Sequence, residues 1–319
     1  MIRFALTTLL VVFACSPAQD PKQDPKPPTA PPRAATQEPG KQEPGKPVDP
    51  KAQALMDELK KQLQQEGITY DAATGTVAVK AVVNQPQDPI EYLLIHRKGK
   101  RHEALFVTKA KPSVLNAALL LLGLKAGTNA SYKEKDPAPT LEEVQNGADP
   151  VVVTPPKGEP FWMTVRWRRG EDTATEKAPV VEHCVEDLIL DRTTGLPIVD
   201  CSWVYLGGRL AQLYRDEPEV FIADFEGNLI STCYMAPDNH LGTVVHAQAR
   251  DDQNWWMTNL MPAPDTEVEF VFHARMPKVH EERLQRLAKE KANPPAVDPK
   301  APPAVETKTP PAGEGERPR

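Results

Sequence analysis

The chain has 319 residues and a formal net charge of −6. This mildly acidic balance gives no reason to expect nucleic acid as a partner, because phosphate binding usually requires a concentrated basic surface. Many of the 35 prolines lie in residues 16–50 and 293–319, which have too few apolar side chains to offset the entropy lost on folding. The composition therefore predicts a single folded domain over residues 67–276 with a proline-rich segment on each side.

The amino terminus predicts export from the cytoplasm. In residues 1–14, the basic Arg3 precedes an apolar run that is too short to span a membrane but has the length of a signal-peptide core. Residues 12–15 resemble a bacterial lipoprotein processing site, which implies that Cys15 is lipidated and begins the mature chain. The alternative is a secretory signal that is cleaved nearby. A lipidated Cys15 would anchor the protein to a membrane of the cell envelope.

The segment after Cys15 predicts a tether and then a helix. Residues 15–50 have the composition of an extended, disordered linker that holds a domain away from its anchor. Residues 51–66 place leucines four positions apart before Gly67, which is typical of an amphipathic helix with a narrow apolar stripe.

The folded part is predicted to be rich in strands. Residues 90–96 and 102–108 read as a hairpin that reverses at Gly99. Residues 112–124 form a helix that is apolar nearly all round, so it should be covered on several sides. Many short strand-like segments follow, and residues 161–167 alternate as in a half-buried strand. We therefore expect a β-rich α+β domain, in which a mainly antiparallel sheet or a partly closed barrel packs on one buried helix.

Residues 277–319 differ again in composition. They begin with a charged segment of helical character and continue into the second proline-rich region. We expect a charged helix followed by a disordered tail.

His102 and Glu103, in the segment HEALF, are the first candidates for chemistry. A zincin motif needs a second histidine four residues after the first, but Phe106 occupies that position. In a strand, the side chains of His102 and Glu103 would point to opposite faces and could not cooperate. His96 could approach His102 across the predicted hairpin, either as an opportunistic metal pair or as an exposed pair at the hairpin mouth.

An enzyme would therefore need a site assembled from histidines and acidic residues that are dispersed in the sequence. The first candidates are Glu91, His96, His102 and Glu103, which His183, Asp187 or Asp238 could join in space. The CxxC, EF-hand, GxGxxG, GxSxG and P-loop patterns do not occur in the sequence, so we predict neither a metal nor a cofactor.

The cysteines after Cys15 allow a disulfide only in one register. Cys184 and Cys201 flank a predicted hairpin, and a two-residue loop would place them opposite each other. A longer turn with Gly195 at positive φ would displace them or turn them to opposite faces. The alternative is that both, like Cys233, are small buried or half-buried thiols.

Adjacent tryptophans could provide a surface for carbohydrate stacking. Trp255 and Trp256 must point in opposite directions if the backbone is extended, so one of them could be exposed.

Six segments in order resemble the YdjY-like domain, a bacterial family often found in exported proteins and lipoproteins. They read IEYLLIHRKGKRHEALF, PSVLNAALLLLGLKAG, VEDLILDRTTGLP, SWVYLGGR, DFEGNLIS and NWWMTNLMPAPDTEVEFVF. The resemblance covers residues 67–276 and implies no established activity. The family tends to have a serine where this chain has Ala104, so any nucleophilic role of that serine is absent here. Some relatives carry ferredoxin-type cysteine segments, which this chain lacks, so no iron–sulfur cluster is implied.

Together these features favour a membrane-anchored envelope lipoprotein whose domain binds or scaffolds an envelope protein or a polysaccharide. The alternatives are an extracytoplasmic enzyme with the dispersed histidine and glutamate site, and a carbohydrate-binding module. A deep pocket with several of the candidate groups in hydrogen-bond reach would indicate the enzyme, whereas a shallow groove would indicate the binding module.

Overall fold

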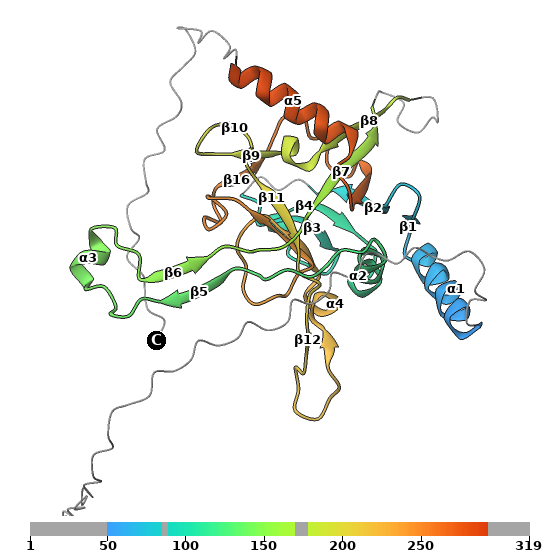
Figure 1. The fold of residues 1–319 in the computed structure, drawn as a ribbon, viewed down its shortest axis with the longest axis horizontal. Helices are drawn as coiled ribbons and strands as arrows, with labels where there is room; N and C mark the ends of the chain where they lie inside the picture. Colours follow the sequence, from blue (N-terminus) through green and yellow to red (C-terminus); the bar gives the residue numbers. More distant parts are fainter. Residues whose placement is uncertain (1–49, 85–88, 170–177, 293–319) are drawn as a thin grey trace, which may run out of the picture. The chain divides into compact units, whose positions relative to one another are not determined.

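The computed structural model describes residues 50–84, 89–169 and 178–292 (Figure 1). The predicted signal peptide, Cys15, the tether after it and the proline-rich tail lie outside these residues. None of the helices in the described part of the chain has both the length and the apolar character needed to cross a membrane.

Eight strands form a closed barrel. They pair in the order β2, β17, β7, β11, β15, β14, β3 and β4, and β4 pairs back with β2. Neighbouring strands are antiparallel except in the pairs β14–β15 and β3–β4, which are parallel. The β-rich α+β class is therefore confirmed, with a closed barrel of mixed strand direction. The strands are β2 (Thr76–Val83), β17 (Glu267–His273), β7 (Pro160–Arg168), β11 (Ser202–Tyr205), β15 (Gly242–Val245), β14 (Asn228–Ser231), β3 (Tyr92–His96) and β4 (Ala104–Thr108).

Aromatic side chains fill much of the barrel interior. Phe270 and Phe272, two positions apart on β17, point to the same face. The ring of Phe270 lies 5.8 Å from that of Phe106 on β4, although β4 and β17 are not neighbours, so this contact crosses the interior. Phe272 stacks at 6.3 Å on Phe161 of β7. Phe161, Met163, Val165 and Trp167 of β7 are all buried, as the predicted alternation requires, although Thr164 between them is buried as well.

The predicted hairpin over residues 90–108 is wrong. Strands β3 and β4 are parallel, with Tyr92 beside Ala104 and His96 beside Thr108. The chain returns between them through the short 3-10 helix η1 (Arg101–Glu103). Gly99 is required by close backbone approach, since a Cβ atom at this position would lie 2.8 Å from the carbonyl oxygen of Gly227.

Further strands extend the barrel or project from it. Strand β1 (Ile68–Asp71) pairs with β2, and β8 (Val180–Cys184) pairs with β7. A small sheet and two hairpins lie off the barrel, and the chain after β8 forms the 3-10 helix η2 (Val185–Leu188). Their strands are β9 (Ile189–Asp191), β10 (Leu196–Pro197) and β16 (Trp255–Met257) in the sheet, and β5 (Ser131–Glu134), β6 (Val151–Thr154), β12 (Leu210–Ala211) and β13 (Val220–Phe221) in the hairpins.

The apolar helix predicted after β4 is α2 (Pro112–Leu121). It contacts α1 (Pro50–Gln65), β1 and α4 (Ile222–Glu226). Within α2, Leu115, Ala118 and Leu119 are fully buried and only Leu120 is largely exposed. The expectation that this helix is covered on several sides is therefore confirmed. A further short helix, α3 (Leu141–Gln145), lies between β5 and β6.

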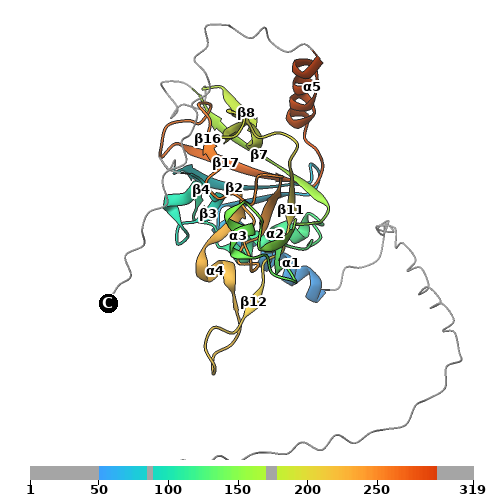
Figure 2. The ribbon, with the colours of Figure 1, turned by 90° about the vertical axis from the view of Figure 1, so that its left-hand side faces the viewer.

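The charged helix after the barrel, α5 (Lys278–Ala292), packs beside β8 (Figure 2). Its Arg283 is buried and donates hydrogen bonds to the Asp187 carboxylate at 2.8 Å and to the Ile198 carbonyl at 2.6 Å. The more exposed Arg286 also donates to Asp187. These bonds attach α5 to η2 and to the chain before β11.

Candidate functional site

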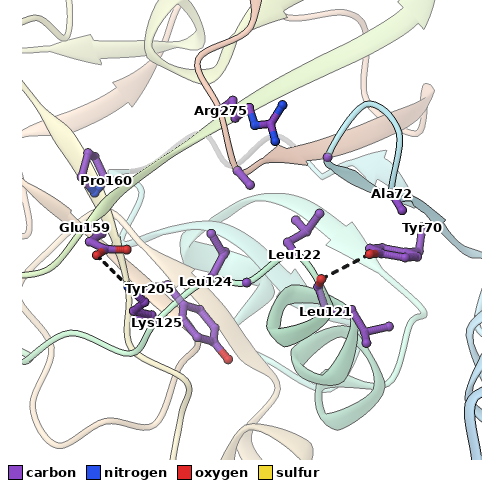
Figure 3. A pocket seen from close by; sticks show the side chains of 13 residues that line it. Tyr70, Ala72, Leu121, Leu122, Leu124, Lys125, Glu159, Pro160, Tyr205 and Arg275 are labelled. Atoms are coloured by element: carbon purple, nitrogen blue, oxygen red, sulfur yellow. Dashed lines mark hydrogen bonds and ion pairs between the residues drawn. The ribbon is translucent and has the colours of Figure 1, made fainter. Parts of the chain in front are cut away.

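A pocket of about 400 Å³ opens between the β1–β2 turn, the C-terminal end of α2 and the start of β7 (Figure 3). Tyr205 enters it from β11, and Arg275 comes from the chain after β17. Apolar side chains form part of the wall: Ala72, Leu121, Leu122, Leu124, Pro160 and Ala274. Pockets of this size typically hold small molecules, or a side group of a larger partner.

The two tyrosine hydroxyl groups of the pocket are already engaged within the protein. The hydroxyl of Tyr70 donates to the Leu121 carbonyl at 3.2 Å, and that of Tyr205 donates to the side-chain oxygen of Asn116. Burial raises the pKa of Tyr205 to about 12, so this phenol is neutral at ordinary pH. Both phenols are therefore suited to shaping the pocket and poorly suited to acting as a base.

Among the charged groups that line the pocket, the guanidinium of Arg275 is available to bind a ligand. Lys125 pairs with Glu159, with 3.2 Å between the ammonium nitrogen and the carboxylate oxygen. Arg275 forms no ion pair or hydrogen bond with any other residue in the described part of the chain. The pocket can thus take a ligand that places an anionic group near Arg275 and an apolar part against the leucines.

A second cluster contains three of the residues predicted from sequence. The parallel register of β3 and β4 brings Glu91 and Glu103 together at the start of both strands, and the Glu91 amide donates to the Glu103 carbonyl at 2.9 Å. His102 Nε2 lies 2.7 Å from Glu103 Oε1. Lys100 Nζ lies 3.5 Å from Glu91 Oε2 and 3.4 Å from Glu103 Oε1.

The prediction that His102 and Glu103 diverge is therefore wrong. It assumed extended backbone, but both residues lie in η1, where the chain turns. The contact is nevertheless open to solvent, because 75% of the His102 side chain is exposed. None of Glu91, His102 and Glu103 lines the pocket described above.

The pKa values of the two carboxyl groups of this cluster are shifted in opposite directions. Burial, the hydrogen bond with Glu103 and the charge of Glu103 raise the pKa of Glu91 to about 7. Burial also acts to raise the pKa of Glu103, but the hydrogen bond with Glu91 and the charges of Lys100 and His102 outweigh it and lower that pKa. The pair can therefore share one proton near neutral pH.

His96, His183 and Asp187 do not join this cluster. His96 is buried at the other end of β3, beside Thr108 on β4, so the predicted approach of His96 to His102 is wrong. Burial lowers the pKa of His96. His183 stacks on Trp167 with 5.0 Å between ring centroids. Asp187 is paired with the arginines of α5, so the dispersed site is only partly assembled.

Comparison with known protein families identifies the domain. The family model described as the YdjY domain matches residues 68–273, which is more than half of the chain. The chain belongs to the YdjY domain family. No curated protein and no solved structure gives a significant match. The matched residues run from the first residue of β1 to the last residue of β17, so they contain the whole barrel.

In this YdjY domain, Ala104 stands where the family tends to have a serine. Ala104 is fully buried at the start of β4 and packs in a small apolar cluster with Tyr92, Ile95 and Val107. It does not line the pocket. A side chain at this position therefore faces other side chains of the barrel wall.

The YdjY domain holds Cys184, Cys201 and Cys233 as free thiols. The chain between Cys184 and Cys201 turns at residues 192–195 with Gly195 at positive φ, which is the longer of the two turns considered above. Cys184 pairs with Thr164 of β7, whereas the hairpin partners of the turn are Asp191 and Leu196. The two cysteines are therefore not opposite each other on paired strands, and the structure contains no disulfide between them.

The tryptophan pair of the YdjY domain points in opposite directions, as extended backbone requires. Trp255 is fully buried and lies edge-on to His246, so a carbohydrate cannot stack on it. Trp256 is half-buried, and the Arg192 guanidinium lies over its ring at 5.3 Å. A sugar that stacked on this face of Trp256 would have to displace Arg192.

The pocket of the YdjY domain was not predicted from sequence. Its residues come from five separate segments, and tyrosine or leucine in such segments is expected in any core. Only the resemblance of residues 203–209 to a family segment gave a signal near Tyr205. Arg275 lies two residues after the matched region and carried no signal.

Proposed function

We propose that the chain is a membrane-anchored lipoprotein of the cell envelope, whose YdjY domain binds a ligand in the pocket beside Arg275. Cys15 would carry the lipid, and residues 15–50 would hold the barrel away from the membrane. Support for the anchor comes from the apolar run, the processing-site pattern and the proline-rich linker in the sequence.

The observation that carries the binding proposal is the character of the pocket. Its tyrosine hydroxyl groups are bonded within the protein, its lysine is paired, and one guanidinium remains available. Catalytic pockets usually contain an acid or base aligned with a nucleophile, and the lining residues offer no such set. The arrangement suits recognition of an anionic group with an apolar neighbour, on a small molecule or on an envelope polymer or protein.

A second candidate function is an enzyme that uses the Glu91–Glu103 pair. Two carboxyl groups that share a proton are a common source of acid and base in one site. The open position of His102 and the absence of these residues from the described pocket favour the first candidate. A site here would have to form at the surface, where water screens its charges.

Photo-crosslinking in intact cells tests the binding proposal. A photoreactive residue replaces Ala72, which is exposed and lines the pocket, and in a control it replaces Leu284, which is 44% exposed on α5. We expect capture of a specific molecule from position 72, reduced at least several-fold by Arg275→Ala. Equal capture from both positions, or capture from position 72 that Arg275→Ala does not change, would contradict the proposal.

A further inference from the structure

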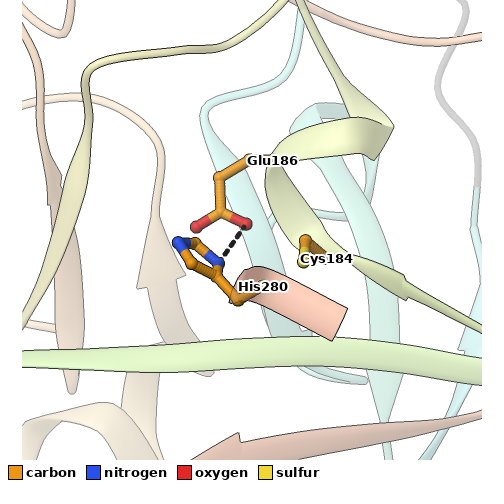
Figure 4. A group of neighbouring side chains, drawn as sticks. All are labelled: Cys184, Glu186 and His280. Atoms are coloured by element: carbon orange, nitrogen blue, oxygen red, sulfur yellow. Dashed lines mark ion pairs between the residues drawn. The ribbon is translucent and has the colours of Figure 1, made fainter. Parts of the chain in front are cut away.

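Three side chains that no motif connects meet beneath the first turn of α5. They are Cys184 at the end of β8, Glu186 in η2 and His280 in α5, and one ligand atom of each lies within 4.8 Å of the other two (Figure 4). Cys184 and Glu186 are buried, and the side chain of His280 is 12% exposed. A thiol, a carboxylate and an imidazole are the three side-chain groups that zinc ions bind most often in proteins.

Two polar atoms of this group lack a partner in the protein. Glu186 Oε2 and His280 Nδ1 are buried and accept or donate no hydrogen bond among the described residues. They face each other at 3.8 Å, which is too long for a hydrogen bond (Figure 4). Buried polar atoms without partners are rare in native proteins, so a pair of them directed at a thiol requires an explanation.

The surroundings hold Glu186 and leave its second oxygen free. Trp203 Nε1 donates a hydrogen bond to Glu186 Oε1 at 3.0 Å, which orients the carboxylate so that Oε2 points into the cluster. Such a bond to the outer oxygen is typical of carboxylates that bind metals. The nearby Arg283 is bonded to Asp187 and to the Ile198 carbonyl, so it does not occupy Oε2.

We propose that Cys184 Sγ, Glu186 Oε2 and His280 Nδ1 bind a Zn²⁺ ion. Tetrahedral zinc ligands lie roughly 3.5 Å from one another, and the Glu186–His280 separation of 3.8 Å is already close to this value. The Cys184 thiol releases its proton to solvent as the sulfur–zinc bond forms, and the neutral imidazole binds through Nδ1. The three protein ligands leave one position for water. The ion joins α5 to the barrel, independently of the pocket and of the proposed ligand.

The location of these ligands explains why no metal motif is visible in the sequence. Cys184 and Glu186 are two residues apart, but His280 lies beyond the end of the family match at residue 273. Only the packing of α5 against β8 brings the histidine to the other two. The site therefore depends on the predicted charged helix, for which the sequence indicated no contact with the domain.

Metal titration of the purified folded chain tests this site. Zn²⁺ is titrated in competition with a chromophoric chelator, and Co²⁺ binding is followed by absorption. We expect one tightly bound ion per chain and a near-ultraviolet thiolate-to-cobalt band. Cys184→Ser should abolish the band, and His280→Gln, at the most exposed ligand, should weaken Zn²⁺ binding at least tenfold. Cys233→Ser removes a buried thiol outside the cluster and should change neither result.

Circular dichroism of each variant shows whether it is folded. If His280→Gln is folded and binds Zn²⁺ as tightly as the wild type, the site does not exist as proposed. Failure of the wild type to bind Zn²⁺, or a cobalt complex without the thiolate band, would equally overturn the proposal. A band that persists in Cys184→Ser but disappears in Cys233→Ser would move the thiolate ligand to another place and would also refute it.

Discussion

The carboxyl group of Glu91 owes its chemistry to the direction of the strand that follows it. Because β3 and β4 run parallel, both strands begin at the same end of the barrel, and the glutamates before them become neighbours. Burial and Glu103 together raise the pKa of Glu91 to about 7 from its ordinary value of 4.5. An antiparallel hairpin would have separated the two carboxyl groups, and each would then have titrated independently of the other.

This raised pKa makes the stability of the domain depend on pH. The folded state keeps the proton of Glu91 up to about pH 7, whereas the unfolded state loses it near pH 4.5. The folded state therefore binds more protons in this window, and the free energy of unfolding falls as pH rises through it. Because the Glu91 side chain is 17% exposed and faces Lys100, we expect a loss of about 1–2 kcal/mol.

Glu91→Gln removes the titrating group and should remove this loss. Urea unfolding at several pH values between 4.5 and 8 measures it, and the variant should gain stability relative to the wild type as pH rises. Glu267→Gln changes an exposed glutamate on β17 and serves as the control, which should follow the wild-type pH profile. If Glu91→Gln also follows the wild-type profile, Glu91 does not titrate as described.

At the scale of the elements, α5 extends the folded unit beyond the family match. The match ends at residue 273, but Arg283 of α5 is only 4% exposed and pairs with the buried Asp187. A buried ion pair is costly to break from one side, because the remaining charge stays in the protein interior. The helix is therefore part of the domain that any truncation at the family boundary would damage.

Substituting each arginine of α5 in turn distinguishes the stability contribution of the buried ion pair from that of the exposed one. Arg283→Met keeps most of the apolar stem and should lower the free energy of unfolding by about 3 kcal/mol, the low end for a broken buried pair, because Arg286 still pairs with Asp187. Arg286→Met removes a side chain that is 55% exposed and should cost less than about 1 kcal/mol. Urea unfolding compares the two, and equal costs would contradict this account of α5.

The elements also show what sequence could predict. Regular alternation in β7 and the continuous apolar run of α2 identified their type and burial, because local pattern dictates both. The pairing of β3 with β4 was mispredicted because a connection of a few residues normally joins antiparallel strands, and here it returns through η1 to a parallel partner. This error also affected the predicted site, because His102 and Glu103 were assigned to extended backbone and their side chains were therefore expected to diverge.

Residues that meet only through tertiary packing could not be predicted. Arg275 reaches the pocket after the last barrel strand, and His280 reaches Cys184 and Glu186 from a separate helix. The spacing of these residues along the sequence does not indicate either contact. Strand-rich composition was sufficient for the α+β class, but closure of the barrel depends on the pairing of β4 with β2, which local pattern does not specify.

At the scale of the whole molecule, the proposed lipid anchor depends on a single residue outside the described part of the chain. Cys15→Ala should prevent lipidation and move the protein from the membrane fraction to the soluble fraction after detergent-free lysis. Cys233→Ser, which removes a buried thiol of the domain, is the control and should stay with the membranes. Unchanged membrane association of Cys15→Ala would refute the anchor.

Barrel closure joins the two ends of the YdjY domain. Strand β17 pairs along its whole length with β2, so that His273 lies beside Thr76 and Glu267 beside Val82. A chain that emerges from its amino terminus, from a ribosome or through a translocation channel, cannot complete the barrel until its final strand has appeared. Until then nearly two hundred residues precede the closing strand, and the edge of β2 that β17 covers is open to pairing with other chains.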